Sequence, residues 1–220
     1  MTILDGKKTS EALKQEIAEE VKQLKKQGKK VPHLAAVLVG DDGASLTYVG
    51  SKVKACEQVG FASTLVKLPA DISEEKLLQE IAKLNANPEI DGYIVQLPLP
   101  KHINEQKILL SIDPTKDVDG FHPANFGRMA LDMEAFIPAT PFGIMELLKR
   151  YKVPTQGKHV VVVGRSHIVG RPISILLSQK GAQGNATVTL THSHTPNLAD
   201  LTRQADIVVM ALGIPEFLKG

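Results

Sequence analysis

The sequence predicts an α/β protein of two domains, each built on a parallel β-sheet with helices on both faces. Short apolar runs alternate along the chain with segments of helical periodicity, which is the pattern of βαβ units. A stretch rich in Asp, Gly, Pro and Asn, residues 113–127, interrupts this alternation before a new helix start near Thr140. We therefore expect an N-terminal α/β layer over residues 1–137 and a C-terminal α/β domain over residues 138–220.

The composition is that of a folded, water-soluble chain. Of the 220 residues, 43% are hydrophobic and 23% are charged, and the formal net charge is +2. So small and dispersed an excess of positive charge argues against a nucleic-acid or a membrane partner. Cys56 is the single cysteine, and no apolar stretch approaches the ~20 residues that span a bilayer. With no apolar run at the start of the chain, the expected location is the cytoplasm.

The first domain is expected to hold three strands. Apolar residues recur at helical spacing from Ala12 to Leu24, and Gly28 is placed to end that helix. Ser45 is expected to cap the second helix, which reaches Val59, and a capping box that begins at Asp71 opens the third. The other elements expected here are strands at residues 34–39, 62–68 and 91–96 and a short helix at residues 104–111.

The second domain repeats the alternation after a long loop. Residues 113–127 have no periodicity, and a loop of this length is more often functional than a simple connector. Thr140 followed by Pro141 predicts a helix start, with threonine as the cap and proline in the first turn. The remaining expected elements are strands at residues 160–163, 187–190 and 207–212 and helices at residues 141–151, 172–179 and 197–204.

A glycine turn follows the first strand of the second domain. The strand runs directly into Gly164-Arg-Ser-His-Ile-Val-Gly170, and a helix comes next. Free backbone N–H groups and the helix dipole make such a turn a phosphate site, so we expect a Rossmann-like, NAD(P)-binding domain. The turn departs from G-x-G-x-x-G by one insertion and one serine. A tight strand-to-helix turn without a ligand is the alternative.

The next strand end indicates which dinucleotide is preferred. Sites for NAD usually carry an acidic residue there, whereas residues 191–195 read Thr-His-Ser-His-Thr. We therefore expect NADP, with Arg165 and Ser193 at its 2′-phosphate. The pair His192 and His194 has no neighbouring Cys, Asp or Glu to complete a ligand set, so we expect no metal.

The helix after the first strand carries a polar stripe. Ser45, Tyr48 and Lys52 are spaced at i, i+3 and i+7, which places them on one side of the helix. A neighbouring apolar stripe is expected to face the core, so the polar stripe is expected to point into a cleft. The alternative is a solvated lysine beside a tyrosine that covers apolar surface. The apolar stripe consists of Val49, Val53 and Cys56.

Two further segments lie where a parallel sheet places ligand groups. Gln96 ends a strand, and the stiff Leu-Pro-Leu-Pro segment after it would hold its side chain beside a hydrophobic wall. Asp117 and Asp119 lie at the centre of the long loop. They either form a solvated turn or bind a donor-rich heterocycle, because a carboxylate accepts paired N–H bonds.

Together these segments resemble one known family, the bifunctional methylenetetrahydrofolate dehydrogenase/methenyltetrahydrofolate cyclohydrolases. The resemblance covers the whole chain and rests on six motifs in the order of the family. They are Ser45-x-x-Tyr48-Val49-x-x-Lys52, Gln96-Leu-Pro-Leu-Pro100, Lys116-Asp-Val-Asp-Gly-Phe-His-Pro123, Pro138-Ala-Thr-Pro141, Gly164-Arg-Ser-x-Ile-Val-Gly170 and His192-Ser-x-Thr195.

The resemblance implies an activity and a role for each motif. The implied enzyme oxidises 5,10-methylenetetrahydrofolate with NADP and then hydrolyses the methenyl cation to 10-formyltetrahydrofolate. Lys52 would be the general acid/base, Tyr48 would place it, and Gln96 would hydrogen-bond and tune it. Asp119 would bind the pterin, and the substrate site would also include Ser45, Leu97 and Pro98. The implied cofactor residues are Gly164, Arg165, Ser166, Ile168, Gly170, His192, Ser193 and Gly213, in a homodimer.

Two other functions stay open at this point, and one structural expectation follows from the length. The alternatives are another two-domain NAD(P) dehydrogenase, of amino-acid or shikimate type, and a non-catalytic nucleotide-binding module. Chains of the resembled family continue beyond the equivalent of residue 220. The C-terminal part of the second domain is therefore expected to be missing here, with the strand at residues 207–212 left as an apolar edge.

Overall fold

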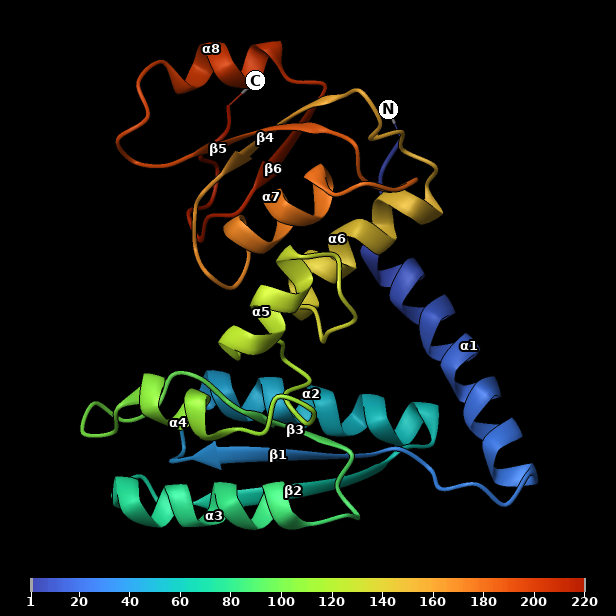
Figure 1. Ribbon diagram of the computed structural model, residues 1–220, viewed down its shortest axis with the longest axis vertical. Coiled ribbons are helices and arrows are strands. Elements are labelled where there is room, and N and C mark those ends of the chain that lie inside the picture. The colour runs from blue at the N-terminus through green and yellow to red at the C-terminus, as the bar shows by residue number, and fades with distance from the viewer. Residues whose placement is uncertain (1, 220) are drawn as a thin grey trace. The chain divides into compact units, whose positions relative to one another are not determined.

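The chain forms two compact α/β units in a computed structural model that describes residues 2–219 (Figure 1). Unit 1 spans Ile3–Ala124 and unit 2 begins at Asn125. The division falls inside the segment at residues 113–127, where the sequence periodicity breaks. Among the described residues, no helix is both long and apolar enough to cross a membrane.

Unit 1 is a parallel three-stranded sheet covered on both faces, as the βαβ pattern predicts. The strand order is β2-β1-β3, and Figure 1 shows α2 and α3 on opposite sides of this sheet. Alternate residues of the central strand point to opposite faces, so Val37 packs with the α3 and α4 cluster while Leu38 packs with α2. The elements are α1 (Gly6–Lys26), β1 (His33–Val39), α2 (Gly43–Val59), β2 (Ala62–Leu68), α3 (Glu74–Ala86), β3 (Gly92–Val95) and α4 (Glu105–Ser111).

Unit 2 has the same topology around a second parallel three-stranded sheet, in the order β5-β4-β6. Its core joins the central strand to α6 and α7, with Val160 and Val162 packed against Ile173 and Leu177. The elements are α6 (Ala139–Arg150), β4 (His159–Val163), α7 (Gly170–Ser178), β5 (Thr187–Thr191), α8 (Leu198–Gln204) and β6 (Ile207–Met210), and α5 (Pro123–Ala130) crosses the division between the units. Among the described strands, β6 pairs with β4 alone.

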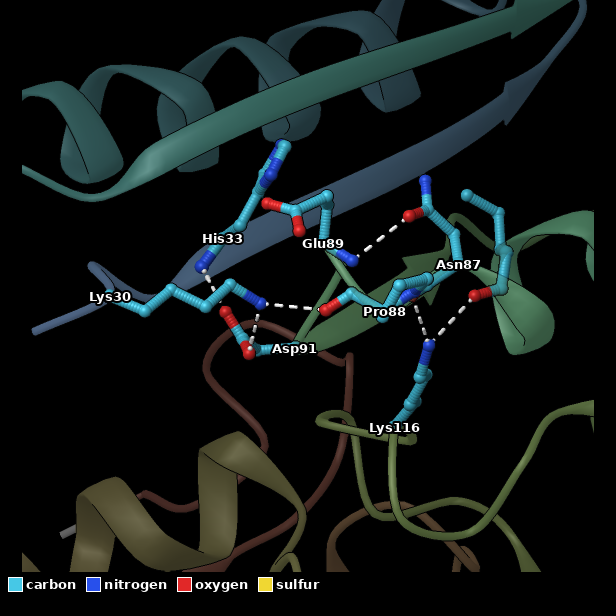
Figure 2. A network of polar contacts seen from close by, with 8 residues as sticks. Lys30, His33, Asn87, Pro88, Glu89, Asp91 and Lys116 are labelled. Carbon is cyan, nitrogen blue, oxygen red and sulfur yellow. Dashed lines mark hydrogen bonds and ion pairs between the residues drawn. The ribbon is translucent and has the colours of Figure 1, made fainter.

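A polar cluster fixes the start of the central strand in unit 1 (Figure 2). The backbone N–H of His33 donates to Asp91 Oδ2 over 2.8 Å, and Lys30 Nζ lies 2.8 Å from Asp91 Oδ1. The His33 ring adds a 2.8 Å hydrogen bond from Nε2 to Thr64 Oγ1 on β2. Nearby, Lys116 Nζ donates to the carbonyl oxygens of Leu84 and Asn87 at the end of α3. The start of β1 is thereby tied to both neighbouring strands.

Unit 2 repeats this strand-start cluster with different residues. The backbone N–H of His159 donates to Asp206 Oδ2 over 2.9 Å, and Lys158 Nζ lies 2.9 Å from Asp206 Oδ1. The His159 ring reaches Thr189 Oγ1 on β5 over 2.9 Å. The two sheets therefore share an order of strands and a way of fixing the first residue of the central one.

Two helix starts in unit 1 differ from the sequence prediction. Asp42, not Ser45, caps α2: its Oδ2 accepts from the Ser45 N–H over 2.8 Å, so Ser45 lies inside the first turn. The capping box at Asp71 is also wrong, because Ser73 caps α3 through a 3.3 Å bond from the Lys76 N–H. A turn that Ile72 closes on Pro69 uses the residues in which that helix was expected to begin.

Three boundaries differ around unit 2. The last third of the predicted loop is helical, because α5 begins at Pro123 and His122 Nδ1 accepts from the Ala124 N–H. Thr140 is no cap, since α6 already begins at Ala139 and no side chain caps it. The last strand ends at Met210, two residues short of the expected end, where its partner β4 gives way to the Gly164 turn.

Candidate active site

The polar stripe of α2 lies at the edge of the unit 1 core. Its apolar neighbours Val49 and Cys56 are 1% and 5% exposed, which confirms the predicted core face. Ser45 is buried as well, within the first helical turn. Tyr48 is 66% exposed and therefore lies more open than the expected cleft position. Lys52 is intermediate, with 36% of its side chain exposed.

Lys52 faces a carboxylate from the long loop. Its Nζ lies 3.8 Å from Asp119 Oδ1, and only 20% of the Asp119 side chain is exposed. Burial raises the pKa of the Asp119 carboxyl, the Lys52 ammonium opposes this rise, and the negative charge of Asp117 adds to it. The pair thus places a cation beside an acid that is held partly out of water.

The backbone of the loop explains how Asp119 reaches this position. Asp117 is 2% exposed, and its Oδ2 accepts from the His122 N–H over 2.8 Å, so this carboxylate holds the loop together. The Tyr93 N–H donates to Lys116 O over 2.9 Å, which lays the loop along β3. Gly92 permits this approach, because a Cβ there would lie 2.2 Å from Val118 Cγ1. Asp117 therefore holds the loop together, while Asp119 faces Lys52.

Gln96 follows β3 directly and presents a buried acceptor. Its N–H donates to Val37 O over 2.9 Å, and its side-chain Nε2 donates to Leu97 O over 2.7 Å. Its Oε1 is buried without a hydrogen-bond partner among the described residues. Buried polar atoms of this kind are rare and call for a ligand or a functional explanation. No hydrogen bond joins Gln96 to Lys52 in the described part of the chain, and Pro98 is exposed.

The glycine turn of unit 2 is held by close backbone contacts. Gly164 has a φ of +113°, and a Cβ there would lie 2.3 Å from Ala211 O. A Cβ on Gly170 would lie 2.0 Å from Gly164 O, so both ends of the turn require glycine. The hydroxyl of Ser166 accepts from the N–H groups of Val169 and Gly170 over 3.2 and 3.3 Å. Ser166, which replaces the second glycine of the fingerprint, therefore binds N–H groups at the start of the following helix.

A cavity of about 480 Å³ opens beside this turn at the carboxyl ends of the unit 2 strands. Four of the predicted cofactor residues line it: Gly164, Arg165, His192 and Ser193. Ser166, Ile168, Gly170 and Gly213 are not among its lining residues. Five other lining residues form an apolar wall with one threonine and were not predicted as cofactor residues, although Thr195 stands in the His192-Ser-x-Thr195 motif. They are Thr195, Leu198, Leu212, Ile214 and Phe217.

The chemistry of the cavity fits an anionic dinucleotide. Its size is within the usual range for ligand sites, and none of its lining residues is acidic. Partial burial lowers the pKa of His192, and the positive charge of Arg165 lowers it further, with a smaller effect from His194. These groups supply donors and positive charge to a phosphate, while the apolar wall suits an aromatic ring.

Among the described residues, no group of three or more His, Cys, Asp and Glu side chains could hold a metal ion. His192 Nδ1 accepts from the His194 N–H over 3.2 Å, so the two histidines are joined by a hydrogen bond within their own turn. Thr191, the last residue of β5, is fully buried and donates from Oγ1 to Val162 O over 3.0 Å.

Comparisons with known proteins match both units. The catalytic domain of the tetrahydrofolate dehydrogenase/cyclohydrolase family matches residues 4–119, and its NAD(P)-binding domain matches residues 138–220. The chain is 71% identical to the bifunctional protein FolD of Flavobacterium johnsoniae over 219 residues, which cover 100% of this chain and 74% of that protein. FolD of Porphyromonas gingivalis is 58% identical over 216 residues, 98% of this chain and 73% of its own.

Solved structures agree with these relatives. The FolD methylenetetrahydrofolate dehydrogenase/cyclohydrolase of Campylobacter jejuni superposes with a TM-score of 0.94 at 45% identity, covering 100% of this chain and 76% of its own. The Trypanosoma brucei enzyme, complexed with NADP cofactor and inhibitor, gives 0.90 at 38% identity over 97% of this chain and 72% of its own.

Fold and sites together define a class, that of two-unit α/β enzymes with a Rossmann-like nucleotide domain. Within that class, the chain belongs to the tetrahydrofolate dehydrogenase/cyclohydrolase family, as its six motifs predict. Neither alternative, an amino-acid or shikimate dehydrogenase or a non-catalytic module, is favoured by these comparisons.

Proposed function

We propose that the protein oxidises 5,10-methylenetetrahydrofolate to the 5,10-methenyl cation with NADP and hydrolyses that cation to 10-formyltetrahydrofolate. The observation that carries this proposal is the Lys52–Asp119 pair, 3.8 Å apart at the polar edge of unit 1. It supplies a mobile proton donor and acceptor beside a carboxylate that suits a donor-rich pterin. Relatives named as bifunctional FolD proteins support both reaction steps.

Each side chain of unit 1 has a part in the proposed reaction. Lys52 acts as the general acid/base that moves a proton to and from water in the hydrolytic step. Tyr48 positions Lys52, and the buried Gln96 Oε1 accepts a hydrogen bond when the site is assembled. Asp119 accepts N–H bonds from the pterin. Ser45 supports the start of α2, and Leu97 and Pro98 line the substrate.

The cavity of unit 2 would hold NADP, which supplies a hydride acceptor when bound. Gly164 allows the close backbone approach, and Arg165, His192 and Ser193 face the 2′-phosphate end. Ser166, Ile168, Gly170 and Gly213 shape the turns around it. The proposed domains are residues 1–137 for folate and residues 138–220 for NADP, in a homodimer located in the cytoplasm.

The experiment that tests this function is the Lys52→Met substitution, with Lys54→Met as the control on the exposed side of the same helix. Dehydrogenase activity is followed by the absorbance of NADPH and cyclohydrolase activity by loss of the methenyl cation. We expect the cyclohydrolase activity to fall by about 10²- to 10⁴-fold in Lys52→Met, because a proton-transfer group is lost from the hydrolytic step. Folate binding measured by calorimetry should persist.

Two results would contradict the proposal in different ways. Unchanged hydrolysis of the methenyl cation by Lys52→Met would remove the acid/base role of Lys52. Failure of the wild-type protein to bind any reduced folate would remove the folate function altogether. The Lys54→Met control should keep both activities within about twofold of wild type, as exposed substitutions away from a site usually do.

A further inference from the structure

The turn that follows β5 is closed by hydrogen bonds between its two ends. The N–H of His192 donates to Thr195 Oγ1 over 2.9 Å, and the N–H of Thr195 donates back to His192 O over 2.8 Å. Inside the turn, the His194 N–H donates to His192 Nδ1 over 3.2 Å. One side-chain oxygen, that of Thr195, thus completes a ring of contacts that fixes the backbone on either side of Ser193.

This turn forms a wall of the unit 2 cavity. His192, Ser193 and Thr195 all line it, together with Arg165 from the glycine turn. Arg165 is close enough for its charge to lower the pKa of His192, so the two turns face a common space. The hydroxyl oxygen of Thr195 accepts from the His192 N–H, so this side chain is oriented by the turn that it closes.

We propose that Thr195 is a positioning residue that sets the preference for NADP over NAD. It acts through the backbone of the turn, by holding His192 and Ser193 in place opposite Arg165 to receive the 2′-phosphate. The inference rests on the proposed NADP function and gives a role to Thr195, the last residue of the His192-Ser-x-Thr195 motif. A fixed turn loses less conformational freedom when an anion binds than a loose turn does.

The preference separates this role from a merely structural one. NAD lacks the 2′-phosphate, so it gains nothing from a correctly placed Ser193 and His192. Loosening the turn should therefore weaken the binding of NADP and leave the binding of NAD unchanged. General damage to unit 2 would weaken the binding of both dinucleotides, because they share the rest of the cavity.

The test measures binding directly, by calorimetry of NADP, NAD and adenosine 2′,5′-bisphosphate with the purified protein. Thr195→Val keeps the shape of the side chain and removes the oxygen, and Thr195→Ser restores the oxygen. Thr202→Val is the matched control, since Thr202 Oγ1 donates to Ala199 O within α8. Arg165→Met provides a reference for loss of a direct 2′-phosphate contact.

We expect Thr195→Val to raise the Kd for NADP and for the bisphosphate by roughly 3- to 10-fold, the effect of one lost hydrogen bond. The Kd for NAD should stay within about twofold, and Thr195→Ser should restore NADP binding. Equal weakening of NADP and NAD, or no change in either, would overturn the inference.

Folding is checked by circular dichroism, and Thr195→Ala carries the same test if the valine variant does not fold. A wild-type protein that binds NADP and NAD equally well would also overturn the inference. A wild-type protein that binds neither would instead contradict the proposed function. The failure of the inference and the failure of the function are thus distinguishable.

Discussion

Lys52 and Asp119 come from different parts of unit 1, yet their charged atoms lie 3.8 Å apart. Lys52 lies on α2, and Asp119 lies on the loop between α4 and α5. Asp119 is the more buried of the two, and burial raises the pKa of its carboxyl. An ionised acid in this place destabilises its own unit, which is a common property of functional sites.

The first prediction concerns this trade between stability and function. Asp119→Asn removes the desolvation penalty of an ionised carboxylate, so we expect no fall in melting temperature at pH 7. We also expect activity to fall 10-fold or more, roughly the effect of one charge-assisted hydrogen bond. Because folding raises the pKa of Asp119, wild type should regain stability relative to the variant as the pH falls towards 4, roughly the ordinary Asp value. Thermal melts across that range check this, and a melting temperature below wild type at pH 7 would refute it.

A second prediction follows from the glycine turn. Gly164→Ala forces a side chain into a backbone with a φ of +113° and to within 2.3 Å of Ala211 O. We expect unit 2 to lose about 2 kcal/mol or more and the Kd for NADP to rise. Gly143→Ala is the control: it lies in α6 with nothing within 4 Å of the new Cβ, so it should be neutral or slightly stabilising. Denaturant unfolding and calorimetry measure both variants.

A third prediction uses the two strand-start clusters. Partial burial raises the pKa of Asp91, but Lys30 and the His33 N–H outweigh it and hold that pKa below its ordinary value. The His159 N–H and Lys158 lower the pKa of Asp206. Since folding lowers both values, the ionised carboxylates stabilise the protein above pH ~4, and this contribution is lost as the pH falls further.

The variants Asp91→Asn and Asp206→Asn should therefore melt below wild type at pH 7 and approach it at about pH 3, below the ordinary Asp pKa. The effect should be modest, because both carboxylates are partly exposed. Asp71→Asn, at an exposed position in the turn before α3, serves as the control. A gap that stays constant between the two pH values would contradict the account.

A fourth prediction tests the two cores separately. Leu77 in unit 1 and Leu177 in unit 2 are both 0% exposed, so replacement by alanine should remove about 2–5 kcal/mol from the unit that holds it. Leu131→Ala is the control, because Leu131 is 73% exposed and should change stability by less than about 0.5 kcal/mol. Hydrogen exchange resolved by residue reports which unit loses protection, and equal loss in both units from one substitution would be the contrary result.

Much of the fold follows from local patterns in the sequence. The predicted strand at residues 62–68 is found as β2 with the same bounds, because its apolar residues lie between clear turn signals. Helix starts were less predictable, since Asp42 and Ser45 are both residue types that cap helices well, and the structure uses Asp42. The two sheets and their order agree with the α/β prediction.

The candidate sites were predicted in part. The motifs predict Lys52, Asp119 and Arg165 as site residues. Their spacing along the chain does not predict the contact between Lys52 and Asp119, because that contact depends on the fold. Thr195 stands in the His192-Ser-x-Thr195 motif, but the motif does not reveal what its side chain contacts, and Phe217 lines the cavity from outside every motif. Gly92 was a sequence signal that the loop packs closely against β3, because a Cβ there would collide with Val118.

The strand-start clusters have a consequence for how each sheet can change. His33 and His159 tie the amino ends of the central strands, whereas Gln96 and Gly164 lie at the carboxyl ends. The contacts that fix the strands and the candidate site residues thus lie at opposite ends of each parallel sheet. Loops at the carboxyl ends can accept new side chains, and hence new ligands, while the residues that keep each sheet in register stay untouched.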